Sequence, residues 1–173
     1  PTGRPADEDL SKDSARYMDI PITPAYAFGH GLSYAAFEYG ILQLSAETLA
    51  PGDTLTISAD ITNTSQSDAD EVVQLYVRDP VAQVARPQQE LRGFTRVSIA
   101  AGKTKRVAFM LRPEQFAYFA PSGQFEADAG RIDFGIGAGS ADIRLTGQFR
   151  LTAPVMANGP AAALATPVSI VED

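Results

Sequence analysis

Apolar and polar residues alternate with a period of two through most of this chain, from about Tyr39 onward. In residues 54–62, apolar side chains occupy every second position between threonine, serine and aspartate. The same alternation recurs in segments 42–44, 73–77, 91–99, 107–111, 132–136 and 143–151. This period is typical of strands with one buried and one solvent-exposed face, and turn residues separate the segments. The sequence therefore predicts an all-β fold, an antiparallel β-sandwich of about seven strands.

The residues on either side of these segments differ in composition. Residues 1–38 contain four prolines and a polar stretch, which predicts an irregular, extended N-terminal arm with a single helical turn at residues 13–18. We expect the sandwich to occupy residues 39–152, with one helical turn at residues 114–119. The Ala/Pro-rich C-terminal tail, residues 153–173, predicts a segment that is mobile or packed on a neighbour, with a short edge strand at residues 167–171.

Charge and composition exclude several classes of partner. The formal net charge is −7, with 21 acidic and 14 basic residues, which argues against nucleic acid and against an anionic membrane surface. No apolar run is long enough to span a membrane. There is no cysteine, so neither disulfides nor thiolate metal sites are expected. The chain begins at Pro1 with neither an initiator methionine nor a signal peptide, so we expect a processed product or part of a longer polypeptide.

The stretch Tyr26–Tyr34 concentrates aromatic rings and glycines just before the first predicted strand. Gly29 and Gly31 permit backbone angles that other residues avoid, and the rings offer a large apolar area for contact with another surface. This stretch resembles the Pro/Ala-Phe-Gly-His-Gly-Leu-Ser-Tyr segment that opens the C-terminal fibronectin type III-like domain of glycoside hydrolase family 3, the β-glucosidase and β-xylosidase group.

Further segments resemble the same family in the same order. Thr2–Pro5 resembles the exit of its α/β domain, and Ser14–Asp19 resembles its Ser-Arg-Tyr-x-Asp stretch. Thr62–Thr64, Val73–Val77 and Arg86–Phe94 resemble its Thr-Asn turn, its Val-Gln-x-Tyr strand and its Arg-Pro…Leu-Lys/Arg-Gly-Phe pattern. Ala27 stands where proline is usual, and the last twenty residues do not resemble the usual end of the domain.

The resemblance implies a fibronectin type III/immunoglobulin-like sandwich that completes a larger enzyme. The parent is expected to hydrolyse terminal, non-reducing β-D-glucosyl or xylosyl residues in the periplasm or outside the cell. The partners implied are its catalytic barrel and its α/β domain, and the carbohydrate substrate is met through the parent. The residues expected to pack between domains are Arg16, Tyr17, Tyr26, Phe28, His30, Leu32, Tyr34 and Phe37.

Catalytic residues are not evident in this chain. Glycoside hydrolysis needs two carboxyl groups held about 5–10 Å apart, and the Ser-Asp-Trp-like context of the family's nucleophile is absent. Asp60 and Asp133 fall on the polar phase of their strands, which predicts solvated carboxylates. His30 is the single histidine; with Arg16 it is the candidate for a position near the substrate, although contact between domains is favoured for both. Asp68, Asp70 and Glu71 lack calcium-loop spacing and are interpreted as a solvated turn, so no metal or cofactor is expected.

Three other functions stay open at this point. A free-standing carbohydrate-binding module needs exposed aromatic rings, and its candidates are Tyr76, Tyr118 and Phe119. A free-standing adhesion module predicts an arm that is ordered without a partner, and a self-sufficient hydrolase is the weakest alternative. The basic group Arg86, Arg92 and Arg96 favours pairing with neighbouring acids over anion binding.

Overall fold

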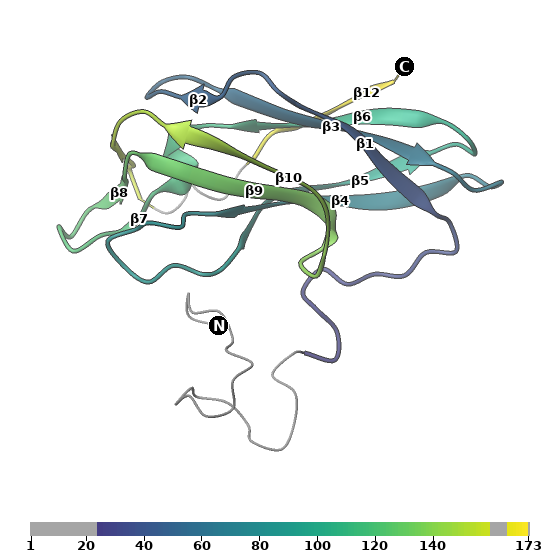
Figure 1. Ribbon diagram of the computed structural model, residues 1–173, viewed down its shortest axis with the longest axis horizontal. Coiled ribbons are helices and arrows are strands. Elements are labelled where there is room, and N and C mark those ends of the chain that lie inside the picture. Colours follow the sequence, from purple (N-terminus) through teal and green to yellow (C-terminus); the bar gives the residue numbers. More distant parts are fainter. Residues whose placement is uncertain (1–23, 160–165, 173) are drawn as a thin grey trace.

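The computed structural model describes residues 24–159 and 166–172 of the chain. Within them the polypeptide forms twelve strands and one short 3-10 helix (Figure 1). The elements are β1 (Phe37–Leu44), β2 (Thr48–Leu49), β3 (Leu55–Asn63), β4 (Ala69–Arg78), β5 (Glu90–Ile99), β6 (Thr104–Leu111), η1 (Pro113–Phe116), β7 (Tyr118–Phe119), β8 (Phe125–Ala127), β9 (Gly130–Gly139), β10 (Asp142–Leu151), β11 (Val155–Met156) and β12 (Val168–Glu172).

Two larger sheets and one small sheet contain these strands. The first has the order β1-β3-β6-β12, and the second has the order β2-β10-β9-β4-β5. All ladders are antiparallel except the short parallel pairing of β2 with β10. The small sheet, β11-β8-β7, lies at one end of the molecule (Figure 1). The two larger sheets pack face to face, as in a β-sandwich.

The predicted all-β fold is confirmed, and each of the seven alternating segments lies in a strand. Four further strands, β2, β7, β8 and β11, are only two or three residues long. The predicted edge strand near the C-terminus is also confirmed, because β12 pairs with β6. A helical turn is present at η1, whereas the turn expected at residues 13–18 lies outside the described residues. No helix in the described ranges is long and apolar enough to cross a membrane.

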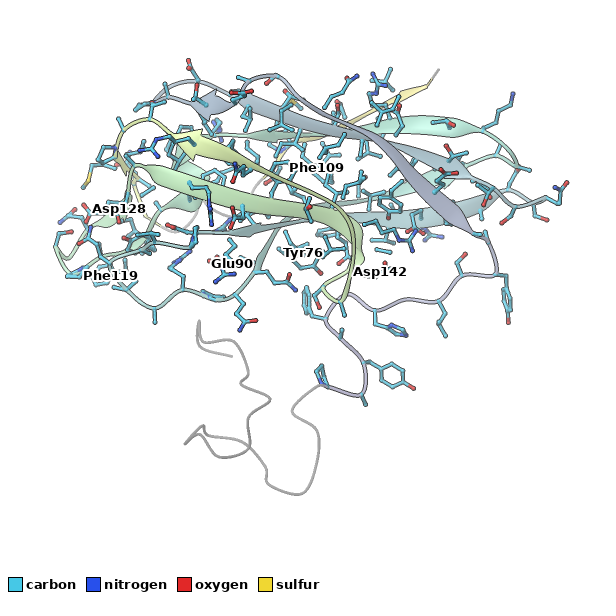
Figure 2. The ribbon with its side chains drawn as sticks, in the orientation of Figure 1. Tyr76, Glu90, Phe109, Phe119, Asp128 and Asp142 are labelled. Atoms are coloured by element: carbon cyan, nitrogen blue, oxygen red, sulfur yellow. The ribbon has the colours of Figure 1, made fainter. Side chains whose placement is uncertain are left out.

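The core lies between the two larger sheets. Phe109 on β6 is fully buried near its centre (Figure 2). It faces Gly93 on β5, where an added Cβ would lie 2.8 Å from Cδ1 of the Phe109 ring. A glycine at position 93 therefore makes room for this ring. Alternate residues of β3, β4, β6 and β9 supply most of the surrounding apolar side chains.

The prediction of a solvated carboxylate at Asp60 is wrong. Asp60 is only 8% exposed, because β3 lies between β1 and β6 and the side chain of Arg106 covers it. Arg106 is directly opposite in the ladder, and its Nε and Nη2 donate to the two carboxylate oxygens over 2.6 and 2.9 Å. This bidentate pair compensates the cost of burying the charge. Asp133, in contrast, is partly exposed and pairs with Arg131, as a polar strand face predicts.

Candidate functional site

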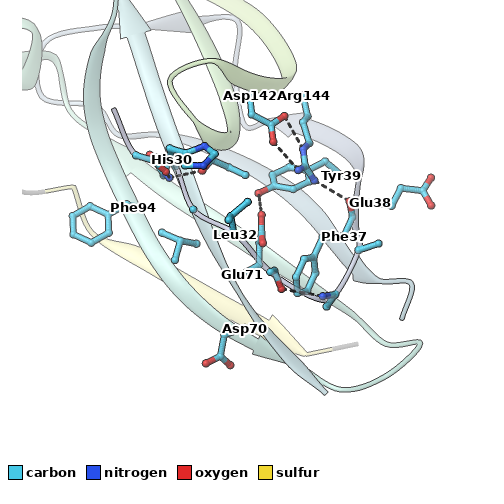
Figure 3. A pocket seen from close by; sticks show the side chains of 18 of the residues that line it. His30, Leu32, Phe37, Glu38, Tyr39, Asp70, Glu71, Phe94, Asp142 and Arg144 are labelled. Carbon is cyan, nitrogen blue, oxygen red and sulfur yellow. Dashed lines mark hydrogen bonds and ion pairs between the residues drawn. The ribbon is translucent and has the colours of Figure 1, made fainter. Parts of the chain in front are cut away.

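A groove of about 930 Å³ lies beside the segment that leads into β1. One wall consists of residues 28–39, and the other consists of parts of β4, β5, β9 and β10 (Figure 3). The groove thus places the aromatic, glycine-rich stretch of the sequence directly against the sandwich. We take this segment and the groove beside it as the candidate functional site.

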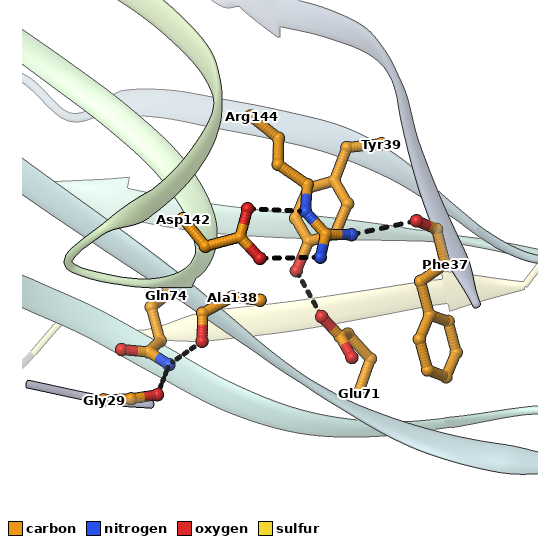
Figure 4. A network of polar contacts seen from close by, with 8 residues as sticks. All are labelled: Gly29, Phe37, Tyr39, Glu71, Gln74, Ala138, Asp142 and Arg144. Carbon is orange, nitrogen blue, oxygen red and sulfur yellow. Dashed lines mark hydrogen bonds and ion pairs between the residues drawn. The ribbon is translucent and has the colours of Figure 1, made fainter. Parts of the chain in front are cut away.

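Backbone hydrogen bonds fix this segment to the sandwich. The carbonyl oxygen of Phe28 accepts from the Ser140 amide over 2.9 Å, and that of Gly29 accepts from the Gln74 side-chain amide over 3.1 Å. Further along, the carbonyl oxygen of Phe37 accepts from Nη1 of Arg144 over 2.9 Å (Figure 4). Three separate points of attachment therefore hold the path of residues 28–37.

Gly29 is required by this attachment. Its φ is +75°, in the left-handed region that residues with a Cβ rarely adopt. A Cβ at this position would also lie 2.2 Å from Oε1 of Gln74. The backbone conformation and the close approach to Gln74 both exclude a side chain here, which explains the glycine within the aromatic stretch.

The side chains of the attached segment face solvent. Phe28 is 67% exposed and Leu32 is 92% exposed, and Tyr26 and Tyr34 are also exposed. The His30 ring lies 5.2 Å from the ring of Tyr26, centroid to centroid. A backbone that is fixed to the domain while its apolar side chains point away from it is typical of a surface that contacts another protein.

Three of the residues predicted to pack between domains do not belong to this exposed segment. Phe37 begins β1, is half-buried and packs against the sandwich core. Arg16 and Tyr17 lie outside the described residues. The assignment of the remaining residues, Tyr26, Phe28, His30, Leu32 and Tyr34, to a contact between domains stays a prediction.

Sequence reasoning missed a second apolar part of this surface. Phe94 on β5 is 63% exposed and borders the groove together with Leu91 and Val72 (Figure 3). It shares the outward face of β5 with Arg96 and Ser98, which are polar. The sequence signal that could have revealed this part of the surface is a large aromatic residue on the polar phase of an alternating strand. The apolar surface therefore extends from the segment before β1 onto the second sheet.

A polar network forms the floor of the groove and ties three strands together. The Tyr39 hydroxyl on β1 donates to Oε1 of Glu71 on β4 over 2.7 Å (Figure 4). On β10, Arg144 donates to both carboxylate oxygens of Asp142, over 3.1 and 2.8 Å. The Arg144 guanidinium also lies 4.7 Å from the centroid of the Tyr39 ring, a cation–π arrangement.

The prediction that residues 68–71 form a solvated turn is wrong for two of the three acids. Asp70 and Glu71 lie in β4, and Glu71 is buried. Burial raises the pKa of Glu71 above its usual value, although the hydrogen bond from Tyr39 acts in the opposite direction. The hydrogen bond from Arg144 lowers the pKa of Asp142. Glu71 and Asp142 are thus held by side chains of this domain, and no group of three potential metal ligands occurs among the described residues.

The three arginines singled out in the sequence pair with acids, as expected. Arg86 and Arg92 each donate to one oxygen of Glu90, over 2.6 and 2.8 Å, and Arg96 pairs with Asp70. Among the aromatic candidates for sugar binding, Tyr76 and Tyr118 are buried and only Phe119 is exposed. Of the three rings that the sequence offered for sugar binding, Phe119 is therefore the one that a carbohydrate could contact.

Comparison with known proteins agrees with this fold. Residues 71–140 match the fibronectin type III-like domain family, so the chain carries a domain of that class. A crystal structure of a β-glucosidase from Listeria innocua in complex with glucose superimposes with a TM-score of 0.79 and 31% identity, over 88% of this chain and 21% of that one.

Individual enzymes are similar in sequence to most of this chain. A periplasmic β-glucosidase of Salmonella typhimurium is 33% identical over 151 residues, covering 87% of this chain and 20% of the relative. A β-xylosidase of Formosa agariphila is 38% identical over 131 residues, covering 76% of this chain and 18% of the relative. The chain thus spans about a fifth of the length of these enzymes. It belongs to the fibronectin type III-like domains of glycoside hydrolase family 3 enzymes of the β-glucosidase and β-xylosidase type.

Proposed function

We propose that this chain is the non-catalytic C-terminal module of a family 3 glycosidase, and that it stabilises the enzyme by docking against its catalytic domains. The observation that carries the proposal is the segment Tyr26–Tyr34, whose backbone is bound to the sandwich while its apolar side chains face outward. The match to about a fifth of each relative supports the presence of much more protein beside this domain.

The docking surface that we propose combines the segment before β1 with the exposed face of β5. Phe28, Leu32 and Phe94 supply apolar area around the groove, and His30 with Tyr26 supplies rings with a polar edge. Aromatic residues are enriched in protein interfaces because they bury large areas at a low cost in conformational entropy. We assign His30 to this contact between domains. The partners are the catalytic barrel and the α/β domain of the same enzyme.

The activity that we propose for the whole enzyme follows from its relatives. It hydrolyses terminal, non-reducing β-D-glucosyl or xylosyl residues, as the names β-glucosidase and β-xylosidase of the relatives imply. The carbohydrate is bound by the catalytic domains, not by this module. A periplasmic or extracellular location is in keeping with the periplasmic relative.

An activity assay tests the non-catalytic role. The 173-residue chain should release no nitrophenol from aryl β-glucosides or aryl β-xylosides, whereas an equimolar amount of the enzyme that contains it should release nitrophenol readily. The expectation follows from Glu71 and Asp142 in the groove, whose carboxylates already bind Tyr39 and Arg144. Turnover by the chain alone would contradict the proposal. In affinity electrophoresis on soluble glucans, retardation of the chain would favour the carbohydrate-binding alternative instead.

A further inference from the structure

Gln74 on β4 is a buried polar side chain that joins three parts of the domain. It is 4% exposed, and its Nε2 donates to the carbonyl oxygens of both Gly29 and Ala138, over 3.1 and 2.7 Å (Figure 4). Gly29 belongs to the segment before β1, and Ala138 belongs to β9. One amide group therefore connects that segment to the second sheet.

Tyr76 fixes the orientation of this amide. Its hydroxyl donates to Oε1 of Gln74 over 2.6 Å, and its ring is buried two residues further along the same face of β4. Because Oε1 accepts this hydrogen bond, the two N–H groups of the amide point toward the carbonyl oxygens. The neighbouring bond from the Ser140 amide to the Phe28 carbonyl holds the adjacent peptide unit.

Resting on the function proposed above, we propose that Gln74 is a positioning residue for docking. Together with Tyr76 it holds the Phe28–Gly29 backbone in the conformation that presents the Phe28 ring to the catalytic domains. Fixing a flexible backbone costs conformational entropy, so a segment that is ordered in advance loses less free energy when it docks. The pair has no contact with substrate and acts only through the shape of the docking surface.

The substitution Gln74→Glu tests this role with little change in size. A carboxylate would place an oxygen against the carbonyl oxygens of Gly29 and Ala138, and both hydrogen bonds would be lost. In the 173-residue chain, amide hydrogen exchange of Ser140 should become at least about tenfold faster, because losing buried hydrogen bonds of this kind shifts local opening by such factors. Amides within β3 and β6 should keep their protection. The matched control is Gln66→Glu, which adds the same charge in an exposed turn.

The second readout uses the enzyme that contains this sequence. The half-life of its aryl-glucosidase activity at a fixed, elevated temperature should shorten about tenfold in Gln74→Glu and in Phe28→Ala, and should stay unchanged in Gln66→Glu. Faster Ser140 exchange together with a shorter half-life supports the proposal. Unchanged Ser140 exchange, or an unchanged half-life where Phe28→Ala shortens it, overturns the role of Gln74 and leaves the docking function intact.

Two further outcomes are decisive as well. If Phe28→Ala itself leaves the half-life unchanged, the docking function fails and the role of Gln74 fails with it. If Gln74→Glu also accelerates hydrogen exchange of the amides in β3 and β6, the whole sandwich is destabilised. The milder variant Tyr76→Phe then tests the role of Gln74. That variant keeps the buried ring and removes only the hydroxyl that orients the amide. It must accelerate Ser140 exchange and shorten the half-life, and failure to do either overturns the proposal.

Discussion

Replacing Phe109 with alanine should lower the free energy of unfolding of the sandwich by about 3–5 kcal/mol. The ring is fully buried on β6, opposite Ile57 on β3 and Val168 on β12 in the ladders. On its other side it faces Gly93, which has no side chain to move into the space left behind. The loss therefore combines the transfer of an aromatic ring to water with a cavity that the neighbours cannot fill. Urea unfolding of the chain, followed by circular dichroism, would measure it.

The matched control for this prediction is Phe94→Ala in the same chain. It removes the same side chain from an exposed position on β5, so its effect should stay within about 0.5 kcal/mol. Equal losses for Phe94→Ala and Phe109→Ala would mean that the two rings are equally buried, and the core described above would be wrong.

Replacing Phe28 with alanine should destabilise the enzyme that contains this domain far more than the isolated domain. In the isolated chain the ring is 67% exposed, so its removal should change the free energy of unfolding by no more than about 0.5 kcal/mol. In the enzyme, we expect the ring to be an anchor of the contact between domains, where truncation costs about 2 kcal/mol or more. Thermal unfolding of both forms, by calorimetry, would measure the difference.

Phe119→Ala is the control that separates this contact from any exposed ring. Phe119 is comparably exposed, but it lies in the small sheet at one end of the molecule and does not line the groove (Figure 2). Its removal should have the same small effect in the isolated chain and in the enzyme. Equal destabilisation of chain and enzyme by Phe28→Ala would refute the proposed docking role.

Period-two alternation was sufficient to predict the main strands, because each of them has a face in the core that repeats every second residue. It could not reveal β2, β7, β8 and β11, since two or three residues are too few to show a period. It was misleading at Asp60, where the polar phase of β3 is covered by Arg106, a residue that is 46 positions away in sequence. Burial of this kind depends on which strands are neighbours in the sheet. The residue pattern within one strand does not contain that information.

The proposed docking segment is visible in the sequence, whereas its attachment to the sandwich is not. The aromatic residues and glycines of Tyr26–Tyr34 marked it as a contact surface, and the family resemblance gave it a context. The hydrogen bonds that hold it come from Gln74 on β4, from Ser140 in the connection between β9 and β10, and from Arg144 on β10. In the alternation, Gln74 is an ordinary residue on the outward face of β4. Its burial follows only from the segment that folds over it.

On the docking proposal, the side chains of Phe28, Leu32 and Tyr34 contact protein that lies outside these 173 residues. Hydroxyl-radical footprinting with mass spectrometry measures the exposure of these side chains directly, in the isolated chain and in the enzyme that contains it. We predict high reactivity of all three in the isolated chain and strong protection in the enzyme, with Phe119 equally reactive in both. Equal reactivity of Phe28, Leu32 and Tyr34 in the two forms would contradict the proposed docking of this segment.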